Sequence, residues 1–286
     1  MVVGNYCIDR LLGGGEMGTV YAATHVGLRR PVALKVMAPE LVGEPVLVQR
    51  FLREARAAAR IRHDHIINVF DVGIDNDLPY LAMELLDGES LGRRFGRGVV
   101  ETEELVGIML PVLAAVGTAH EAGIIHRDLK PENVFLSRDT RGQMRPVVLD
   151  FGISKIADEA AMKLTDTQAV MGTPHYMSPE QAIGARNVTG ATDQYAVGVI
   201  MYEGAVGKRP FTGNSLLEIF QDISKGIYVP PRRANPAVPS ELARIIERAM
   251  AREANARYPN LWHLGRVLLP LASRGDQETW QKTFWR

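Results

Sequence analysis

The sequence predicts an α+β protein with a small β-rich N-terminal part and a larger, mainly helical C-terminal part. Residues 6–38 are rich in β-forming residues and glycine, which favours strands. Residues 51–61 are dense in alanine and arginine and predict a helix. Between residues 103 and 122 apolar side chains recur at helical spacing, which predicts a long helix ending at Gly123. With 286 residues the chain is long enough for two modest lobes or one large domain.

Composition narrows the class of protein. Hydrophobic residues make up 46% and charged residues 23%, which is typical of a soluble globular protein. Lys plus Arg and Asp plus Glu number 33 each, so net charge favours neither nucleic acid nor a membrane surface as partner. The single Cys7 excludes an internal disulfide. No run approaches the roughly 18 to 20 uninterrupted apolar residues of a spanning helix. We therefore expect a cytoplasmic chain without a membrane segment or a nucleic-acid partner.

The stretch His126-Arg-Asp-Leu-Lys-Pro-Glu-Asn133 concentrates two acids, three basic side chains and an amide between apolar flanks. Asp128 is suited to receive a hydroxyl proton, Lys130 to meet a phosphate and Asn133 to hold a metal. Pro131 argues against a helix here. The order H-R-D-x-x-x-x-N is the pattern of the protein-kinase catalytic loop.

A glycine-rich segment lies near the N-terminus. Gly13, Gly15 and Gly18, followed by Val20, give G-x-G-x-x-G-x-V. Without side chains, the backbone N–H groups of such a loop can lie over phosphate oxygens. A glycine-rich hairpin turn is the alternative. A dinucleotide site is disfavoured, because it requires a helix after the glycines where residues 19–24 favour a strand.

Charged side chains occur at two apolar segments, Lys35 within residues 31–37 and Asp150 after residues 147–149. Lys35 lies within residues 31–37 and either faces solvent or needs an anionic partner. Glu54 is the only acid in the helix of residues 51–61. Asp150 ends the apolar strand of residues 147–149 and is followed by Gly152, which suits a metal ligand on a movable turn. An ordinary Asp-x-Gly turn is the alternative.

These motifs, together with G-T-x-x-Y-x-S-P-E at residues 172–180, resemble the catalytic domain of bacterial Hanks-type (eukaryotic-like) serine/threonine protein kinases, similar to the PASTA-receptor kinase group. The resemblance covers about residues 6–270. It implies the bilobal protein-kinase fold, with an N-lobe at residues 1–86, a C-lobe at residues 87–272 and a tail at residues 273–286. It also implies phosphotransfer from ATP to Ser/Thr hydroxyls of proteins, with Mg²⁺, or alternatively Mn²⁺, as the metal.

The resemblance assigns roles to individual residues. Asp128, Lys130 and Lys35 are the expected catalytic residues, and Asn133 and Asp150 the expected metal ligands. The residues expected to contact the nucleotide cofactor are Leu12, Gly13, Gly15, Gly18, Val20, Ala33, Lys35, Glu54, Met83, Glu84, Leu86, Asp87, Asn133, Phe135 and Asp150.

Regulation is expected in residues 155–172. Thr165 and Thr167 fall where related kinases carry paired autophosphorylation sites, and Arg127 is the expected phosphate sensor. Two solvated threonines without a regulatory role are the alternative. Thr173 is expected to bridge Asp128 and Lys130.

Structural roles also follow from the resemblance. Glu54 is expected to pair with Lys35, and Glu180 with Arg257. Asp193 is expected to support the catalytic-loop backbone. From the residue types themselves, Thr192 or Asp193 is expected to be the N-cap of the helix that starts there.

Phe70 and Ala58 are expected in an internal hydrophobic spine. Gly204 is expected to loosen the packing around its own position. His63 and His65 are expected to be structural rather than metal-binding.

The sequence leaves open the function, the partners and location of the chain, and the role of its two tail tryptophans. The main rival function is a catalytically weak pseudokinase scaffold, which usually lacks one of the residues present here as Lys35, Asp128 and Asp150. A small-molecule kinase of the aminoglycoside type is a weaker rival. The partner expected besides protein substrates is a second copy bound through the N-lobe. The alternative to a cytoplasmic chain is the cytosolic domain of a longer membrane receptor. Trp280 and Trp285 suit either packing or an interface.

Overall fold

The computed structural model describes residues 1–15, 18–139, 142–151, 174–184, 188–213 and 215–285, without the side chain of Glu54. It divides into two compact units. The smaller comprises Met1–Gly88 and the segment that begins at Asp150. The larger comprises Glu89–Leu149 and the chain from Thr173 to Arg286.

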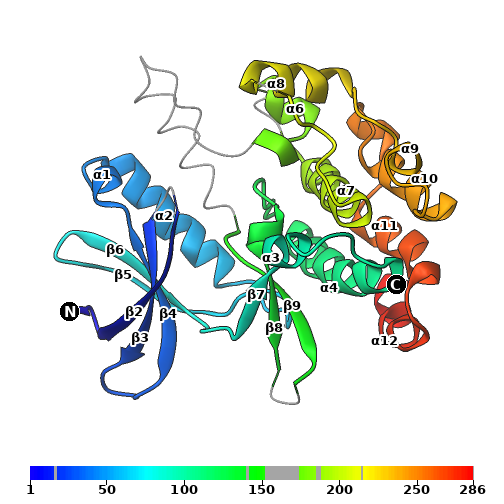
Figure 1. Cartoon of the computed structure of the whole chain (residues 1–286). Helices are drawn as coiled ribbons and strands as arrows, with labels where there is room; N and C mark the ends of the chain where they lie inside the picture. Colours follow the sequence, from blue (N-terminus) through cyan, green and yellow to red (C-terminus); the bar gives the residue numbers. More distant parts are fainter. Residues whose placement is uncertain (16–17, 140–141, 152–173, 185–187, 214, 286) are drawn as a thin grey trace. The chain divides into compact units, whose positions relative to one another are not determined.

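The smaller unit is built on a six-stranded antiparallel sheet (Figure 1). Its order is β1-β2-β3-β4-β6-β5, so consecutive strands are mostly hydrogen-bonded neighbours. The strands are β1 (Val2–Val3), β2 (Tyr6–Gly15), β3 (Gly18–His25), β4 (Pro31–Met37), β5 (Val69–Asp75) and β6 (Leu78–Met83). The strands expected within residues 6–38 are confirmed.

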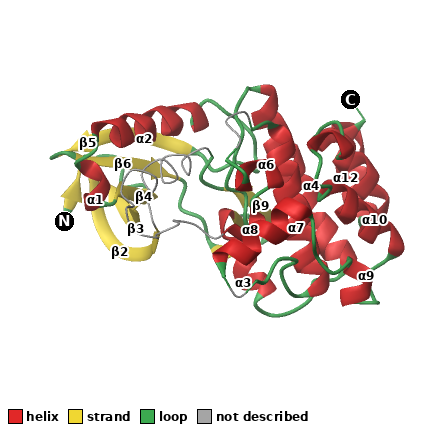
Figure 2. Cartoon of the chain, turned by 90° about the horizontal axis from the view of Figure 1, so that it is seen from above, coloured by secondary structure: helices red, strands yellow, loops and turns green. Residues whose placement is uncertain are grey.

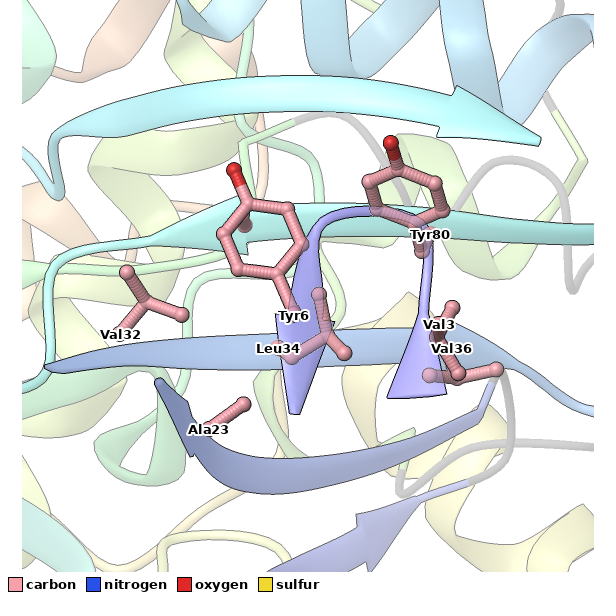
Figure 3. Packing of buried hydrophobic residues seen from close by; sticks show 8 residues of the cluster. Val3, Tyr6, Ala23, Val32, Leu34, Val36 and Tyr80 are labelled. Atoms are coloured by element: carbon pink, nitrogen blue, oxygen red, sulfur yellow. The ribbon is translucent and has the colours of Figure 1, made fainter. Parts of the chain in front are cut away.

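One face of this sheet holds an apolar cluster (Figure 3). Val32, Leu34 and Val36 alternate along β4 and point to this face, as the period of two requires. Tyr6 and Tyr80 join them, and both hydroxyls donate to Asp71 Oδ2, at 3.2 and 3.3 Å. Burial, followed by the nearby Asp71 carboxylate, raises the pKa of Tyr6 to about 12. The tyrosines therefore stay protonated and act as donors.

The opposite face is covered by helix α2 (Pro45–Ala58), which follows the short α1 (Pro39–Val42). Phe51 and Ala55 of α2 have no exposed surface and pack with Met37 and Leu81. The expected helix therefore forms and begins six residues earlier than predicted, at a proline suited to the first helical turn.

The expectation for Phe70 was wrong. Its side chain is 38% exposed, and the Arg30 guanidinium lies 3.9 Å from its ring centroid. A bulge between Val69 and Asp71 shifts the register of β5. Val69 instead packs against the cluster under α2, while Ala58 is buried as expected.

The larger unit is mainly helical (Figure 2). A three-stranded sheet of order β7-β8-β9 accompanies the helices. The strands are β7 (Gly88–Ser90), β8 (Val134–Arg138) and β9 (Met144–Val148). The helices are α3 (Leu91–Phe95), α4 (Thr102–Glu121), α6 (Pro179–Ala182), α7 (Gly190–Val206), α8 (Leu216–Lys225), α9 (Pro231–Ala234), α10 (Ser240–Ala249), α11 (Leu261–Leu268) and α12 (Arg274–Phe284), with 3₁₀ turns at Pro131–Asn133, Pro174–Tyr176, Ala254–Ala256 and Leu269–Leu271.

Helix α4 is long and apolar enough to cross a membrane by length and composition alone. However, 72% of its most apolar window is buried inside the protein, as in the core helix of a globular unit. Gly123 follows it with φ of 75°, which a glycine adopts without strain, so the predicted helix end is confirmed.

Helix α7 is buried on nearly all sides. Its N-cap is Thr189, whose hydroxyl accepts from the Ala191 N–H, so the prediction of Thr192 or Asp193 was wrong. Both lie inside the first turn and are fully buried, because their side chains bond to groups in the core instead.

The expectation of loose packing at Gly204 was also wrong. A Cβ at this position would lie 2.8 Å from Leu105 Cδ1 and 3.1 Å from the Phe95 ring. Glycine is present because α7 passes close to these side chains, and the packing is tight.

A similar close approach at Gly198 predicts the effect of one methyl group. In Gly198→Ala the new Cβ would lie 2.7 Å from Met250 Cγ and 3.2 Å from the Met250 backbone nitrogen. We expect a loss of about 1–3 kcal/mol in unfolding free energy, because α10 must move away from α7. Denaturant titration measures it.

The control is Gly275→Ala in α12, where a Cβ meets nothing within 4 Å. Alanine there should stabilise slightly through its better helix propensity. Equal stability of the Gly198→Ala variant and the unaltered protein would contradict the close packing.

Candidate active site

The backbone of the catalytic-loop stretch is hydrogen-bonded to Asp193, whose side chain has no exposed surface. Its Oδ2 accepts from the His126 N–H at 2.8 Å and its Oδ1 from the Arg127 N–H at 2.7 Å. His120 Nε2 lies 2.7 Å from Oδ2. Burial by itself raises the pKa of Asp193, but the hydrogen bonds from His120 and the backbone outweigh it and hold that pKa below its ordinary value. The expected support of the loop by Asp193 is confirmed.

His126 joins the loop to the residue before Asp150. Its Nε2 donates to the Leu149 carbonyl at 2.8 Å, and its Nδ1 accepts from the Asp128 N–H at 3.3 Å. Because a carbonyl only accepts, this pair of contacts selects the tautomer protonated at Nε2. The Leu149 N–H in turn donates to the Asn133 carbonyl at 2.9 Å.

Asp128, Lys130 and Asn133 converge in the larger unit. Asp128 Oδ2 lies 2.9 Å from Lys130 Nζ and 3.1 Å from Asn133 Nδ2. Asn133 Nδ2 also donates to the Asp128 carbonyl at 2.7 Å. The Asp128 side chain is 35% exposed, so its carboxylate can be reached from solvent. With the amide nitrogen turned to Asp128, the amide oxygen of Asn133 faces away from it.

Two residues at the ends of this region have strained backbones. Arg127 has φ of 69° and Asp150 has φ of 54°, a region that residues with side chains seldom adopt. Such strain persists only where surrounding contacts hold it, and it concentrates at functional sites.

In the smaller unit, strand register gathers several predicted residues on one face. Gly13 lies opposite Val20, Val20 opposite Lys35, and Ala33 opposite Met83. Lys35 and Ala33 are two apart on β4 and therefore share this face. Lys35 is only 7% exposed, and its Nζ lies 2.8 Å from Asp150 Oδ1. A buried lysine is thus paired with the predicted metal-binding acid.

The glycine-rich hairpin has glycines of two kinds. A Cβ at Gly18 would overlap the Val36 carbonyl oxygen, and φ there is 154°, so the fold itself requires this glycine. At Gly13, Gly14 and Gly15 a Cβ would meet no atom of the described chain within 4 Å. Their lack of side chains is therefore explained by something other than packing.

The remaining predicted residues are placed as follows. Glu54 lies on α2, but its side chain is outside the described residues, so its pairing with Lys35 stays a prediction. Glu84 follows β6 and its carboxylate accepts from Asn68 Nδ2 at 3.0 Å. Leu86 is half-buried, Asp87 exposed and Leu12 40% exposed. Phe135 lies on β8 of the larger unit and is half-buried.

Several expectations lie outside the described residues: those for Gly152, Thr165, Thr167 and Thr173. His63 and His65 are described, and the His65 N–H donates to His63 Nδ1 at 3.2 Å. Within the described part of the chain, no group of three or more His, Cys, Asp or Glu residues could hold a metal.

Glu180 and Arg257 form the expected structural pair, in which the Arg257 side chain is buried. Both Arg257 terminal nitrogens donate to the Glu180 carboxylate at 2.8 Å, and Arg257 Nε donates to the Ala251 carbonyl at 2.9 Å. Burial by itself raises the pKa of Glu180, but the Arg257 hydrogen bonds and charge outweigh it and lower that pKa. Because Thr192 also donates to Glu180, the pair ties α6 to α7.

Two positioning residues, His120 and Gln181, were not predicted from the sequence. His120 bonds to Asp193, and Gln181 Nε2 donates to the Arg127 carbonyl at 2.8 Å. The only signal for His120 was its place in the last turn before Gly123. Gln181 gave a clearer one, because Ser178 and Gln181 have the spacing of a capping box, which the structure contains.

Comparison with known proteins gives a consistent family assignment. The model of the protein kinase domain family matches residues 6–261. A solved structure of the PknI kinase domain from Mycobacterium tuberculosis is similar, with a TM-score of 0.75 and 27% identity over 95% of this chain and 98% of that chain.

Curated relatives are similar in sequence. The chain is 41% identical to the serine/threonine-protein kinase Pkn1 of Myxococcus xanthus, over 90% of this chain and 37% of that protein. It is 34% identical to PrkC of Bacillus subtilis, over 90% of this chain and 39% of that protein. PknL of Mycobacterium tuberculosis is 36% identical, over 93% of this chain and 65% of that protein. The chain therefore spans about two fifths of the length of the first two relatives.

The Glu180–Arg257 pair makes stability depend on pH in a defined direction. Since the folded pKa of Glu180 is lowered, its stabilising effect is full above the ordinary glutamate pKa of 4.5 and is lost as pH falls through the folded pKa. At neutral pH we expect Glu180→Gln to cost about 3 kcal/mol of unfolding free energy, because Arg257 loses its counter-charge. The difference should shrink below pH 4.5, by at most about 1.4 kcal/mol per pH unit.

Denaturant titrations between about pH 7 and pH 3 measure this. Glu253→Gln, at a side chain 73% exposed, makes the same chemical change without burial and should leave stability nearly unaltered. A Glu180→Gln variant whose deficit stays constant over this range would contradict the assignment.

Proposed function

Because the chain belongs to the protein kinase domain family, we propose that it transfers the γ-phosphate of ATP to serine and threonine hydroxyls of protein substrates. The observation that carries the proposal is the Asp128–Lys130–Asn133 arrangement on a loop anchored by Asp193. The relatives named serine/threonine-protein kinases support the same residue specificity.

Asp128 is the residue to which we assign proton acceptance. A carboxylate that is 35% exposed can meet a substrate hydroxyl, while Lys130 and Asn133 fix its orientation through Oδ2. Positioning matters most here, because phosphoryl transfer requires little covalent chemistry from the protein. The ammonium group of Lys130 would offset negative charge on the transferred phosphate.

The nucleotide contacts are assigned to the smaller unit. A buried lysine needs an anionic partner, and we assign Lys35 to the α- and β-phosphates of ATP. The Asp150 carboxylate lies 2.8 Å from the Lys35 ammonium group, so the two side chains lie together. The open space above Gly13, Gly14 and Gly15 leaves their backbone N–H groups free of side-chain shielding, as close phosphate approach requires. Val20, Ala33 and Met83 supply apolar surface on the same face for the base.

The donor set fits Mg²⁺. Asn133 offers an amide oxygen and Asp150 a carboxylate, the hard ligands that Mg²⁺ prefers. The described residues hold no cluster able to bind a metal by protein groups alone, and Mg²⁺ is typically bound by one or two carboxylates together with substrate phosphates. When bound, the ion would neutralise phosphate charge; Mn²⁺ is the alternative.

Regulation by phosphorylation is part of the proposal. Arg127 Nε is buried and has no hydrogen-bond partner in the described part of the chain. Leaving such a donor unpaired costs free energy, so an acceptor that arrives later would be bound favourably. We assign that acceptor to a phosphate on Thr165 or Thr167.

Partners and location follow from the same function. Protein substrates are the partners proposed, with a second copy bound through the smaller unit, where the exposed Val26 and Leu28 offer apolar surface. The domain is assigned to the cytoplasm, with the cytosolic part of a longer receptor as the alternative. A pseudokinase scaffold is disfavoured, because Lys35, Asp128 and Asp150 are all present.

Removal of the Asp128 carboxylate tests the proposal directly. We expect Asp128→Asn to lower kcat by about 10² to 10⁴-fold, because a general base is lost. ATP affinity should stay unchanged, since the nucleotide contacts are assigned to other residues. Phosphate transfer from labelled ATP to the chain itself and to a generic basic protein measures activity.

The matched control is Glu253→Gln, an exposed carboxylate-to-amide change that should keep full activity. If the Asp128→Asn variant transfers phosphate as fast as the unaltered protein, the assignment fails. If neither protein transfers phosphate but both bind ATP, the pseudokinase scaffold is the better description.

The regulatory assignment has its own test. The double variant Thr165→Ala and Thr167→Ala should lose about tenfold or more in activity, the effect of removing one charge-assisted hydrogen bond. Incorporated phosphate should fall as well, measured by mass-spectrometric site mapping. Thr212→Ala, at an exposed position, is the control; unchanged activity and phosphate in the double variant would refute the assignment.

A further inference from the structure

The C-terminal helix α12 lies beyond residue 261, where the match to the family ends. It does not extend away from the larger unit. It packs on α11 and α4, and Figures 1 and 2 both show it beside α4. A segment that the family pattern leaves unassigned is therefore part of a packed helical layer.

Phe284 carries this packing. Its side chain has no exposed surface. The ring centroids of Trp262 and Trp280 lie 5.9 and 6.1 Å from that of Phe284. A Cβ at Gly265 of α11 would overlap the Phe284 ring atoms, so the ring lies directly on the glycine backbone. Burial of a whole aromatic ring is a large apolar contribution.

Both ends of α12 also have their own stabilising contacts. At its start the Ser273 hydroxyl accepts from the Asp276 N–H at 3.2 Å and caps the helix. At its end Arg266 Nε donates to the Phe284 carbonyl, and the Arg266 guanidinium lies 5.7 Å from the Trp285 ring centroid. A cation at a helix C-terminus is favourable for the helix dipole.

Helix α4 is shaped to receive these neighbours. A Cβ at Gly107 would lie 3.1 Å from Asp276 Oδ2, and one at Gly117 would lie 3.0 Å from the Trp262 ring. The same helix carries His120, which bonds to Asp193 under the catalytic loop. The face of α4 that α11 and α12 cover thus belongs to the element that supports the loop.

We propose that α12 is a C-terminal lock, in which Phe284 seats on Gly265 of α11 and so holds α12 in place against α4. The lock makes residues up to 285 part of the folded larger unit. It also separates the roles of the two tail tryptophans: Trp280 is half-buried against Phe284, whereas Trp285 is 66% exposed. The inference rests on these contacts and is independent of the proposed activity.

A double-mutant cycle of Gly265→Ala and Phe284→Ala on the full chain tests the seat. Phe284→Ala alone should lower Tm by roughly 6 °C or more. Gly265→Ala alone should also lower Tm, because its methyl group displaces the ring. In the background of the Phe284→Ala variant the same change should raise Tm by about 1–3 °C, because alanine then acts only through its helix propensity. The reversal of sign is specific to direct contact.

Two controls separate the lock from general effects on α12. Gly275→Ala, in the same helix and in open space, should raise Tm slightly in both backgrounds. Trp285→Ala, at the exposed neighbour of Phe284, should change Tm by less than about 2 °C. Gly265→Ala effects of the same sign and size in both backgrounds would overturn the proposed seat.

Amide hydrogen exchange tests the effect on α4. In Phe284→Ala, peptides from residues 102–121 should exchange faster than in the unaltered protein, while those from β3 and β4 of the smaller unit should not change. Unchanged protection of α4 in a variant with a lowered Tm would show that α12 folds as an independent element, and the lock would be rejected.

Discussion

Asp193 is the group on which the geometry of the site depends. A carboxylate without exposed surface costs free energy unless hydrogen bonds replace its water, and here the backbone of His126 and Arg127 supplies them. The same bonds hold Arg127 in a strained conformation, from which Asp128 follows. The position of the proposed base, Asp128, is thus set by Asp193, a buried acid on helix α7. His120 provides a further hydrogen bond to Asp193.

Close backbone approach at a glycine recurs at several contacts between helices of the larger unit. Gly198 admits Met250, Gly204 admits Leu105 and Phe95, and Gly265 admits Phe284. Each glycine weakens its own helix by a fraction of a kilocalorie per mole, but allows contact that a methyl group would prevent. The Glu180–Arg257 pair works differently, since the buried arginine also donates to backbone carbonyls of other segments of the chain. The glycine contacts and the Glu180–Arg257 pair together hold helices of the larger unit against one another.

Those parts of the fold and of the site whose residues carry a local or motif-based signal could be predicted from the sequence. The strands of residues 6–38, the long helix before Gly123 and the Glu180–Arg257 pair were predicted correctly. Errors arose where tertiary contacts override local preference. Phe70 looked internal, but a bulge in β5 turns it outward, and Thr192 looked like a cap, but its hydroxyl bonds to Glu180.

The sequence by itself determined the class of fold, the order of the motifs and the residue types that the chemistry needs, because these depend on periodicity and spacing along the chain. Only the tertiary structure decided which partners those residues have. Lys35 contacts Asp150 across 115 positions, His120 reaches Asp193 across 73, and Phe284 meets Gly265 in the neighbouring helix. Such contacts join residues whose separation along the chain follows no fixed spacing, so they depend on how the elements pack in space.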